Sequence, residues 1–460
     1  MAVKNITKGD KVVWMIVLIL TMISLVAISG STSQLLGPEA SSRAELLWKH
    51  AVICAVGFLL ILTCFLIPKK WFETLSKCGF PLSFLLLAIL LGGEKVQIEN
   101  FFKVENINGA VRSIKIFGFQ LHVFEIVKVA MVMYLAWASK AWYNDSFRLS
   151  KKIASFTVKV KDKEGQVRET EPFAWVGKRF WEFFFYILVP VGAVVAMIIP
   201  KGSSSSAMFI GVVMLATLAA GGVKLKHIFA IMLLGLSIVG GAFGLYKISD
   251  GKLCHRVGTA ISRMGEKPTV DDLFKARDTF GKDSPQYKKI LRKIQQPYAA
   301  QIAIHEGGLL KRGFGGSTQK YVVPVMYGDF MYSFILEETG FLGGVAIIIL
   351  YLSLVARGMI IVKNCDDLFD QTAVAGLILL IVGQAFMHIF INLGIGPLSG
   401  QTLPLISHGS TAFLCFSIAF GIILSISSNC WREREAEERE ADIEHNRISP
   451  EDISTDTGDF

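Results

Sequence analysis

The sequence predicts an all-α integral membrane protein with about ten transmembrane helices and both termini in the cytoplasm. Three observations favour this fold class: an apolar composition, apolar runs about as long as a membrane is thick, and basic residues gathered on one side of those runs. Of the 460 residues, 52% are hydrophobic and only 18% are charged, whereas soluble domains carry about 25% charged residues. The mean hydropathy is +0.50. Composition therefore favours a membrane protein over a soluble one.

Ten apolar runs have about the length that a helix needs to cross ~30 Å of hydrocarbon. The first run is long enough to remain in the bilayer, so we expect no cleaved signal peptide. The third run is short and is expected to be tilted or partly buried. The eighth is long, and we expect its first turns at the surface. The runs cover residues 12–30, 50–67, 80–93, 121–139, 181–200, 206–222, 227–246, 333–362, 372–395 and 409–427.

Five stretches rich in lysine and arginine fall on one face of the membrane if every run crosses once. By the positive-inside rule this face is the cytoplasm. The largest stretch is a cytoplasmic insert at 140–180. On the other side lies a large extracytoplasmic loop at 247–330, which is also basic, but long loops translocate largely regardless of charge. We therefore expect a ten-helix membrane domain at 1–430 and a polar, acidic cytoplasmic tail at 431–460.

Charge and cysteine content argue against three kinds of site. The net charge of +9 does not indicate nucleic acid binding, because the basic residues flank membrane spans. No cysteine and histidine spacing is typical of a zinc site. We also predict no structural disulfide, because only one cysteine lies in the outer loop. Cys54, Cys64 and Cys415 lie inside apolar runs, Cys78, Cys365 and Cys430 near run ends, and Cys254 in the outer loop.

Two ionisable residues lie within the fourth run. Glu125 and Lys128 are three positions apart, so they share one helix face and can pair. A charge at the bilayer centre costs about 2.5–3.5 kcal/mol on insertion scales, so this face should point inward. Two interpretations remain: an internal salt bridge that holds the bundle, or a polar cavity for a charged headgroup. In span nine, Gln384, His388 and Asn392 are predicted to form interhelical hydrogen bonds rather than to act as catalysts.

The outer loop ends in a segment that is rich in glycine and basic residues. Lys311, Arg312 and Lys320 would suit a pyrophosphate at the membrane surface, and a solvated basic loop is the alternative. Gly308 and Gly313 have the spacing of a P-loop. However, Phe314 and Gly315 stand where lysine and serine or threonine are needed, so nucleotide binding is rejected.

Asp329 lies between two apolar and aromatic stretches, just before span eight. A carboxylate at the outer mouth of a helix can serve as a general base. An aspartate in this place is also commonly a helix cap, and the residues alone favour the cap.

Four stretches together resemble the SEDS family, which includes FtsW, RodA and SpoVE. They are NGAVRSIKIFGFQLHVFEIVKVA at 108–130, IAIHEGGLLKRGFGGSTQK at 302–320, YGDFMYSFILEETGFLGG at 327–344 and NLGIGPLSGQTLPLISHGSTAF at 392–413. The opening KGDKVVWMI and the acidic tail resemble the FtsW branch more than the RodA branch. In one departure, the family's SYGGS is replaced by SHGST at 407–411.

The resemblance implies an inverting peptidoglycan glycosyltransferase that polymerises lipid II into β-1,4 glycan strands during cell division. It assigns Asp329 as the general base. With the basic residues considered above, we expect eleven residues to contact lipid II or its pyrophosphate, some of them in a central cavity. These residues are Lys49, Arg112, Glu125, Lys128, Lys311, Arg312, Ser317, Gln319, Lys320, Ser407 and Gly409.

The resemblance further implies partners and a location. The partners would be a cognate class B penicillin-binding protein, with spans eight and nine as candidate contacts, and other division proteins. The location would be the bacterial inner membrane at the septum. A divalent cation, Mg²⁺ or Mn²⁺, is compatible with the pyrophosphate, but no ligand cluster in the sequence demonstrates one. Two other functions stay open: a lipid II flippase, or a non-catalytic scaffold of the division machinery.

Overall fold

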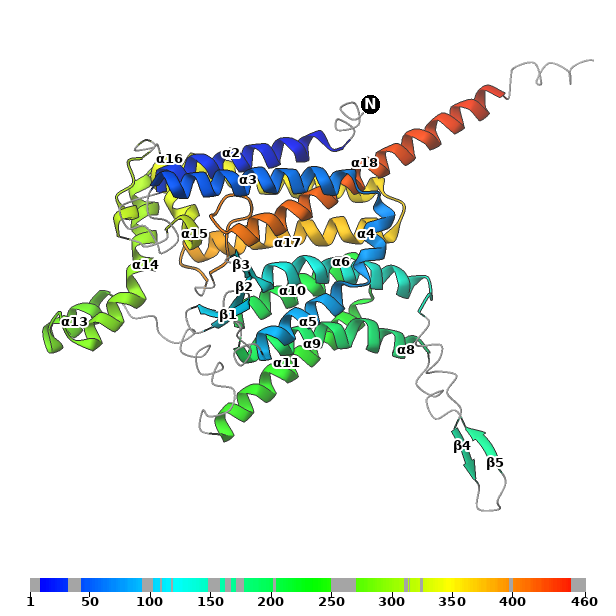
Figure 1. Cartoon of the computed structure of the whole chain (residues 1–460), viewed down its shortest axis with the longest axis horizontal. Coiled ribbons are helices and arrows are strands. Elements are labelled where there is room, and N and C mark those ends of the chain that lie inside the picture. The colour runs from blue at the N-terminus through cyan, green and yellow to red at the C-terminus, as the bar shows by residue number, and fades with distance from the viewer. Residues whose placement is uncertain are drawn as a thin grey trace, which may run out of the picture.

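The computed structural model describes most of the chain as a bundle of long helices (Figure 1). The helices are α2 (Lys11–Ser31), α3 (Arg43–Leu66), α4 (Lys69–Ser76), α5 (Gly79–Gly92), α6 (Val123–Tyr143), α8 (Lys178–Phe183), η3 (Phe184–Leu188), α9 (Val189–Lys201), α10 (Ser204–Ala220), α11 (Leu225–Ile248), α13 (Val270–Phe280), α14 (Pro285–Gly307), η4 (Gln319–Tyr321), α15 (Met326–Asp329), α16 (Met331–Asn364), α17 (Leu368–Asn392) and α18 (Ser410–Arg447). The strands are β1 (Phe102–Ile107), β2 (Ala110–Ile116), β3 (Phe119–His122), β4 (Val158–Lys161) and β5 (Val167–Thr170). The described residues are 9–31, 43–92, 102–107, 110–116, 119–147, 158–161, 167–170, 178–201, 204–249, 270–309, 313, 315–322, 326–396 and 400–447.

Each of the ten predicted apolar runs coincides with a helix, which confirms a helical membrane protein. Seven helices in the described ranges are long and apolar enough to cross a membrane. The pair α4 and α5, bent by 49°, adds an eighth if it forms one broken span, in keeping with a short third run. Of the other two runs, α10 is a shorter apolar helix and α6 carries the charges of Glu125, Lys128 and Lys140. The count of ten spans therefore stays a prediction.

The two ends of the bundle gather the segments that the charge pattern assigned to opposite faces. Figure 1 shows α4, α8 and the projecting end of α18 at one end, and α13, α14 and α15 at the other. The first group belongs to the predicted cytoplasmic face and the second to the predicted outer loop. The tail predicted from residue 431 begins as an uninterrupted continuation of α18, which runs to Arg447.

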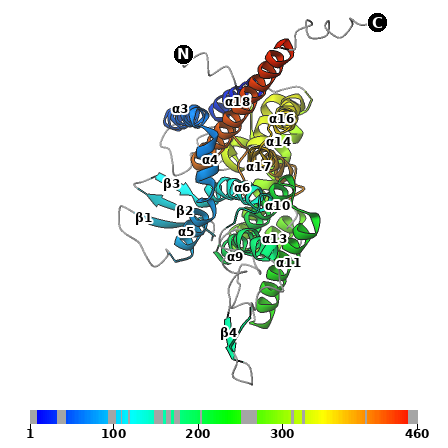
Figure 2. The same cartoon turned by 90° about the vertical axis from the view of Figure 1, so that its right-hand side faces the viewer.

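Two apolar cores fill the bundle, and α6 and α17 hold them together. One core is built from α2, α3 and α16 to α18, and the other from α5, α6, α9 and α10. The end-on view in Figure 2 shows α6 and α17 between these groups. Helix α17 is buried along most of its length and packs against α16, α6, α10 and α18. Of the two spans suggested as partner contacts, α16 is thus the more exposed.

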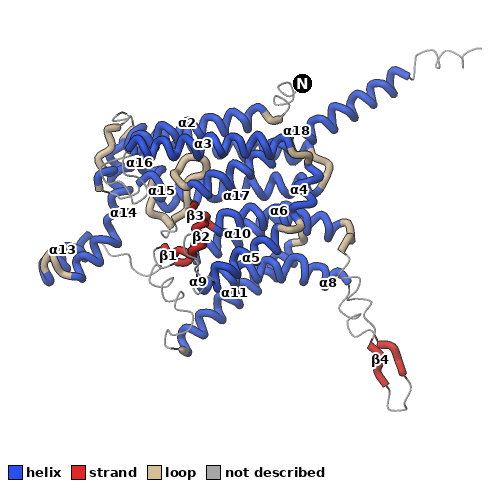
Figure 3. The backbone as a smooth tube through the Cα atoms, in the orientation of Figure 1, coloured by secondary structure: helices blue, strands red, loops and turns tan. Residues whose placement is uncertain are grey.

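A small antiparallel sheet, drawn red in Figure 3, precedes α6 and was not predicted from the sequence. Strands β1, β2 and β3 pair in sequence order, with Ile114 opposite Leu121. The sheet is tied to the start of α18, because the Thr411 hydroxyl donates to the Gln120 carbonyl (2.9 Å) and accepts from the His122 N–H (3.2 Å). Its strands are too short and too polar to have stood out beside the apolar runs.

The prediction that no structural disulfide forms was wrong. Cys365, at the C-terminal end of α16, is bonded to Cys430 on α18. The sequence places both cysteines near run ends on the same face. Whether two such ends meet depends on which spans pack together, and the linear order does not contain that information.

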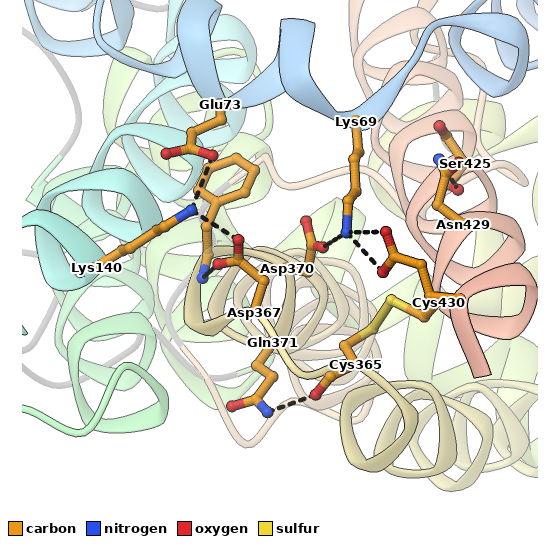
Figure 4. A network of polar contacts seen from close by, with 12 residues as sticks. Lys69, Glu73, Lys140, Cys365, Asp367, Asp370, Gln371, Ser425, Asn429 and Cys430 are labelled. Carbon is orange, nitrogen blue, oxygen red and sulfur yellow. Dashed lines mark hydrogen bonds and ion pairs between the residues drawn. A yellow bond between two sulfur atoms is a disulfide. The ribbon is translucent and has the colours of Figure 1, made fainter. Parts of the chain in front are cut away.

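Polar contacts beside this disulfide join four helices at the predicted cytoplasmic end (Figure 4). Two lysines each bridge two carboxylates from different helices. Lys69 of α4 lies 3.1 Å from Asp370 and 2.8 Å from Glu433, and Lys140 of α6 lies 2.9 Å from Glu73 and 2.7 Å from Asp367. These contacts link α4 to α6, α17 and α18.

Labelling of Cys78 tests the predicted sidedness. Cys78 is exposed between α4 and α5, whereas the other described free cysteines, Cys54, Cys64 and Cys415, are buried. A membrane-impermeant maleimide should therefore modify Cys78 only when the cytoplasmic face is opened, as in inverted vesicles. Cys254 lies outside the described residues and is predicted in the outer loop, so it should react in intact spheroplasts. Mass spectrometry of the labelled peptides separates the two, and the reverse pattern would overturn the orientation.

The second test concerns the close approach of α14 to α16. A Cβ added at Gly307 would lie 2.1 Å from the backbone oxygen of Leu336, so no larger residue fits without moving a helix. We expect Gly307→Ala to destabilise the fold by roughly 1–3 kcal/mol, the usual cost of overpacking. Gly235→Ala in α11 is the matched control, because a Cβ there meets nothing. Thermal unfolding in detergent should show a lower midpoint for Gly307→Ala alone.

Candidate active site

Asp329 ends the short helix α15 and leads directly into α16. Its side chain is exposed, while Met326, Phe330 and Met331 around it are buried. The backbone carbonyl of Asp329 accepts a hydrogen bond from the amide of Asn392 on α17 (3.1 Å). An exposed carboxylate on a buried backbone turn is thus presented at the predicted outer end of the bundle.

The glycine-rich segment before Asp329 is folded around a buried carboxylate on α16. Glu337 is fully buried. Its two oxygens accept from the hydroxyl of Ser317 (2.5 Å) and from the N–H groups of Thr318 (2.6 Å) and Gln319 (3.2 Å). Three donors to one carboxylate can offset much of the cost of burying its charge. Ser317 and Gln319 therefore lie against α16 and are themselves buried.

Glu338 and Lys320 hold the same glycine-rich segment, residues 315–320, against α2. Glu338 accepts from the N–H of Gly315 (2.8 Å) and lies against Gly30. The ammonium group of Lys320 donates to the carbonyls of Gly315 (2.8 Å) and Gly30 (3.2 Å), and the side chain is buried. In this arrangement a direct contact between Lys320 and a pyrophosphate would require the segment to move.

Glu125 and Lys128 form an ion pair of 2.7 Å within the bundle. Lys128 is buried, and its ammonium group also donates to the side-chain carbonyls of Gln384 and, at 3.3 Å, Gln401. It lies 5.7 Å from the ring centroid of Phe209, a favourable cation–π distance. The predicted pairing on an inward face is confirmed. Of its two interpretations, the salt bridge is what the geometry displays, and a headgroup cavity stays a prediction.

A chain of hydrogen bonds joins this ion pair to the helix that follows Asp329. Gln401, whose side chain accepts from Lys128, also accepts at its backbone carbonyl from Nδ1 of His388 (2.7 Å). Nε2 of His388 accepts from the N–H of Tyr332 (3.4 Å). The predicted interhelical role of Gln384, His388 and Asn392 is thereby confirmed. α16 begins buried against α17, and the expectation that the first turns of span eight lie at the membrane surface stays a prediction.

The remaining predicted site residues lie in different surroundings. Ser407 is buried and accepts from the N–H of Leu403 (2.9 Å), closing the turn before α18, and Gly409 lies just beyond that turn. Lys49 lies near the N-terminal end of α3, which is the predicted outer end, and pairs with Glu45 (2.8 Å) on the helix surface. Arg112 lies in β2. Lys311 and Arg312 lie outside the described residues.

Glu337, Glu338 and Gln401 lie within the family stretches, but no role was predicted for them from the sequence. Adjacent glutamates within an apolar run were a usable signal, because two charges there need partners. The identity of those partners, a loop some twenty positions earlier, was not visible in the sequence. Among the described residues, no three histidine, cysteine, aspartate or glutamate side chains gather as metal ligands. The divalent cation therefore stays a prediction.

Comparison with known proteins shows what the segment around Asp329 is similar to. The pattern of the FtsW, RodA and SpoVE family, described as "Cell cycle protein", matches residues 287–431, which include Asp329, Glu337 and Asn392. Over this segment the chain matches the SEDS family. The match extends well beyond this segment. The probable peptidoglycan glycosyltransferase FtsW of Geobacter sp. (strain M18) is 23% identical over 424 residues, 91% of this chain and 96% of the relative.

Further relatives and solved structures show the same resemblance. FtsW of Caulobacter vibrioides is 27% identical over 74% of this chain and 70% of its own length. Stage V sporulation protein E of Bacillus subtilis is 34% identical over 126 residues, 27% of this chain and 34% of its own. A chain from a peptidoglycan synthase complex superposes with a TM-score of 0.60 at 18% identity, and Thermus thermophilus RodA with 0.54 at 17%. Each covers 92% of this chain and 98% of the other, so the SEDS fold is shared throughout.

Proposed function

We propose that this protein is a peptidoglycan glycosyltransferase that polymerises lipid II in cell division, with Asp329 as general base. One observation carries the proposal: an exposed carboxylate stands on a buried, hydrogen-bonded turn at the predicted outer end of the bundle. It does so in a chain that matches proteins named probable peptidoglycan glycosyltransferase over nearly its whole length. Lipid II is presented outside the membrane, where this end of the bundle is predicted to lie.

In the proposed reaction, the Asp329 carboxylate takes the proton from the 4-hydroxyl of the acceptor's N-acetylglucosamine. The same hydroxyl oxygen attacks the anomeric carbon of the donor's N-acetylmuramic acid as the bond to the lipid phosphate breaks. Attack from the opposite face inverts the α-linked donor and yields a β-1,4 bond. Undecaprenyl pyrophosphate leaves, and the proton on Asp329 passes to solvent. No covalent intermediate on the protein is needed.

The leaving pyrophosphate needs cations near Asp329, and we assign this role to Lys311 and Arg312. In the sequence they precede the described residues 315–319, which Glu337 and Glu338 hold against α16. The buried hydrogen bonds of Lys320, Ser317 and Gln319 support a role in shaping this segment. Glu125 and Lys128 would line the cavity that receives the substrate, and Lys49, Arg112, Ser407 and Gly409 would line its approaches.

We also propose a cognate class B penicillin-binding protein as partner, in the inner membrane at the septum. The superposition on a chain from a complex titled as coordinating polymerisation and crosslinking supports a partner of this kind. The exposed apolar side of α16 is a suitable contact surface, with Phe341, Leu342 and Ile349 facing away from the protein.

Purified protein, combined with such a partner and supplied with lipid II, should form glycan ladders that penicillin does not abolish. A flippase would instead move labelled lipid II across a vesicle membrane without making polymer. A scaffold would do neither and yet support division. Absence of polymer from folded, partner-bound protein would overturn the proposed activity.

A further inference from the structure

The start of α16 lacks a cap from its own segment. The first N–H groups of any helix have no partner within the helix and must find one elsewhere, above all when they are buried. The N-cap residue Phe330 provides no side-chain acceptor. Instead, α17 provides two: Nε2 of His388 accepts from the N–H of Tyr332 (3.4 Å), and Oδ1 of Asn392 accepts from the N–H of Ser333 (3.0 Å). One helix thus caps another from the side.

Asn392 forms hydrogen bonds on both sides of the turn that carries the candidate base. Its Oδ1 also accepts from the hydroxyl of Ser333 (2.7 Å). Its Nδ2 donates to the backbone carbonyl of Asp329 (3.1 Å) and to that of His388 in its own helix (2.8 Å). Asn392 is buried, so no water competes for these bonds. A single amide therefore sets the separation of residues 329 and 333, and with it the direction in which the Asp329 side chain leaves the backbone.

His388 is fixed in one neutral form by its two partners. Nε2 faces a backbone N–H and must accept, while Nδ1 faces the carbonyl of Gln401 (2.7 Å) and must donate. Both ring nitrogens are thus engaged with backbone groups. This arrangement holds the ring in place and gives His388 no route to transfer a proton.

We propose that Asn392 is a positioning residue for Asp329, with His388 as its support. Asn392 acts by capping α16 and anchoring the Asp329 carbonyl, without touching substrate. The inference rests on the proposed role of Asp329 as general base. It assigns a positioning role, which packing alone would not require, to two buried polar residues in the last turn of α17.

The test compares Asn392→Leu, which removes every bond of the amide, with Asn392→Ser, which keeps a small polar group too short to span the turn. Misplacing a catalytic group by about 1 Å can cost on the order of 100-fold in rate. We expect both variants to lower kcat for lipid II polymerisation by roughly 10- to 100-fold per folded molecule, with KM within about twofold of wild type. The folded fraction is measured by size-exclusion chromatography and thermal unfolding.

Asn429→Leu is the matched control. Asn429 lies on α18 near the other end of the bundle, where its amide donates only within its own helix, to the carbonyl of Ser425 (2.9 Å). Its kcat should equal that of wild type. If Asn392→Leu does not fold, the kcat of Asn392→Ser decides whether the inference holds.

Two results would overturn the inference: a wild-type kcat in folded Asn392→Ser, or a raised KM with unchanged kcat, which would make Asn392 a substrate contact. Asp329→Asn, measured in parallel, separates this failure from a failure of the proposed function. If Asp329→Asn is inactive while Asn392→Ser is normal, only the positioning role is wrong. If Asp329→Asn polymerises normally, the general-base proposal itself is wrong.

Discussion

Asp329→Asn is expected to lower the rate of glycan polymerisation by about 100-fold or more while leaving the protein folded and in the membrane. General-base catalysis contributes typically 10²- to 10⁴-fold, and an amide cannot accept the proton of the attacking hydroxyl. The side chain is exposed and the amide has the same shape, so the buried turn beneath it should be undisturbed. The measurement is the initial rate of polymer formation from labelled lipid II, normalised to folded protein.

The control for charge loss is Asp366→Asn. Asp366 is exposed between α16 and α17, at the predicted cytoplasmic face. It loses the same charge far from the proposed chemistry and should retain full activity. If both variants polymerise at wild-type rate, Asp329 is not the base and the proposed mechanism has no proton acceptor among the residues considered above.

Lys128→Met is expected to cause the largest loss of stability among single substitutions in the membrane core. It removes the charge partner of Glu125 and one donor each from Gln384 and Gln401. Breaking one side of a buried ion pair typically costs about 3–5 kcal/mol, because the other charge is left uncompensated. Thermal unfolding in detergent should show a strongly lowered midpoint, together with reduced yield of folded protein.

A double substitution separates the two interpretations of this ion pair. Glu125→Gln with Lys128→Met removes both charges of this pair, so it should recover part of the stability that Lys128→Met loses. If the pair only stabilises the helix bundle, catalytic activity should recover together with stability. If it binds a charged headgroup, stability should return and activity should not. Lys288→Met is the control, because its ion pair with Asp283 is exposed and contributes little to stability.

Most of the fold could be predicted because a membrane makes the local sequence decisive. Backbone groups in hydrocarbon must bond within their own segment, so an apolar run of sufficient length is a helix whatever its neighbours are. All ten runs coincide with helices for this reason. The small sheet before α6 was not predicted because it lies at the predicted outer end. There the backbone is not confined to a helix, and a polar segment can form a strand or a loop.

The candidate site could be located but not assembled from the sequence. Asp329 stood out as a carboxylate at the mouth of a span, and Glu125 and Lys128 as charges one helical turn apart. Lys320 was expected to face a ligand, because a basic residue among glycines resembles an anion site. Its burial against Gly30 depends on α2 lying beside a loop 290 positions away, and no local pattern indicates that.

The sequence by itself determined the helical membrane fold, the pairing of Glu125 with Lys128, and the place of Asp329 before span eight. Apolar length and helical periodicity are properties of neighbouring residues, so they can be read along the chain. Only the tertiary structure decided that Cys365 meets Cys430, that Glu337 gathers the glycine-rich segment, and that Asn392 caps the helix after Asp329. Each of these contacts depends on which spans lie side by side, and in lipid many packings of apolar helices satisfy the same hydrophobic pattern.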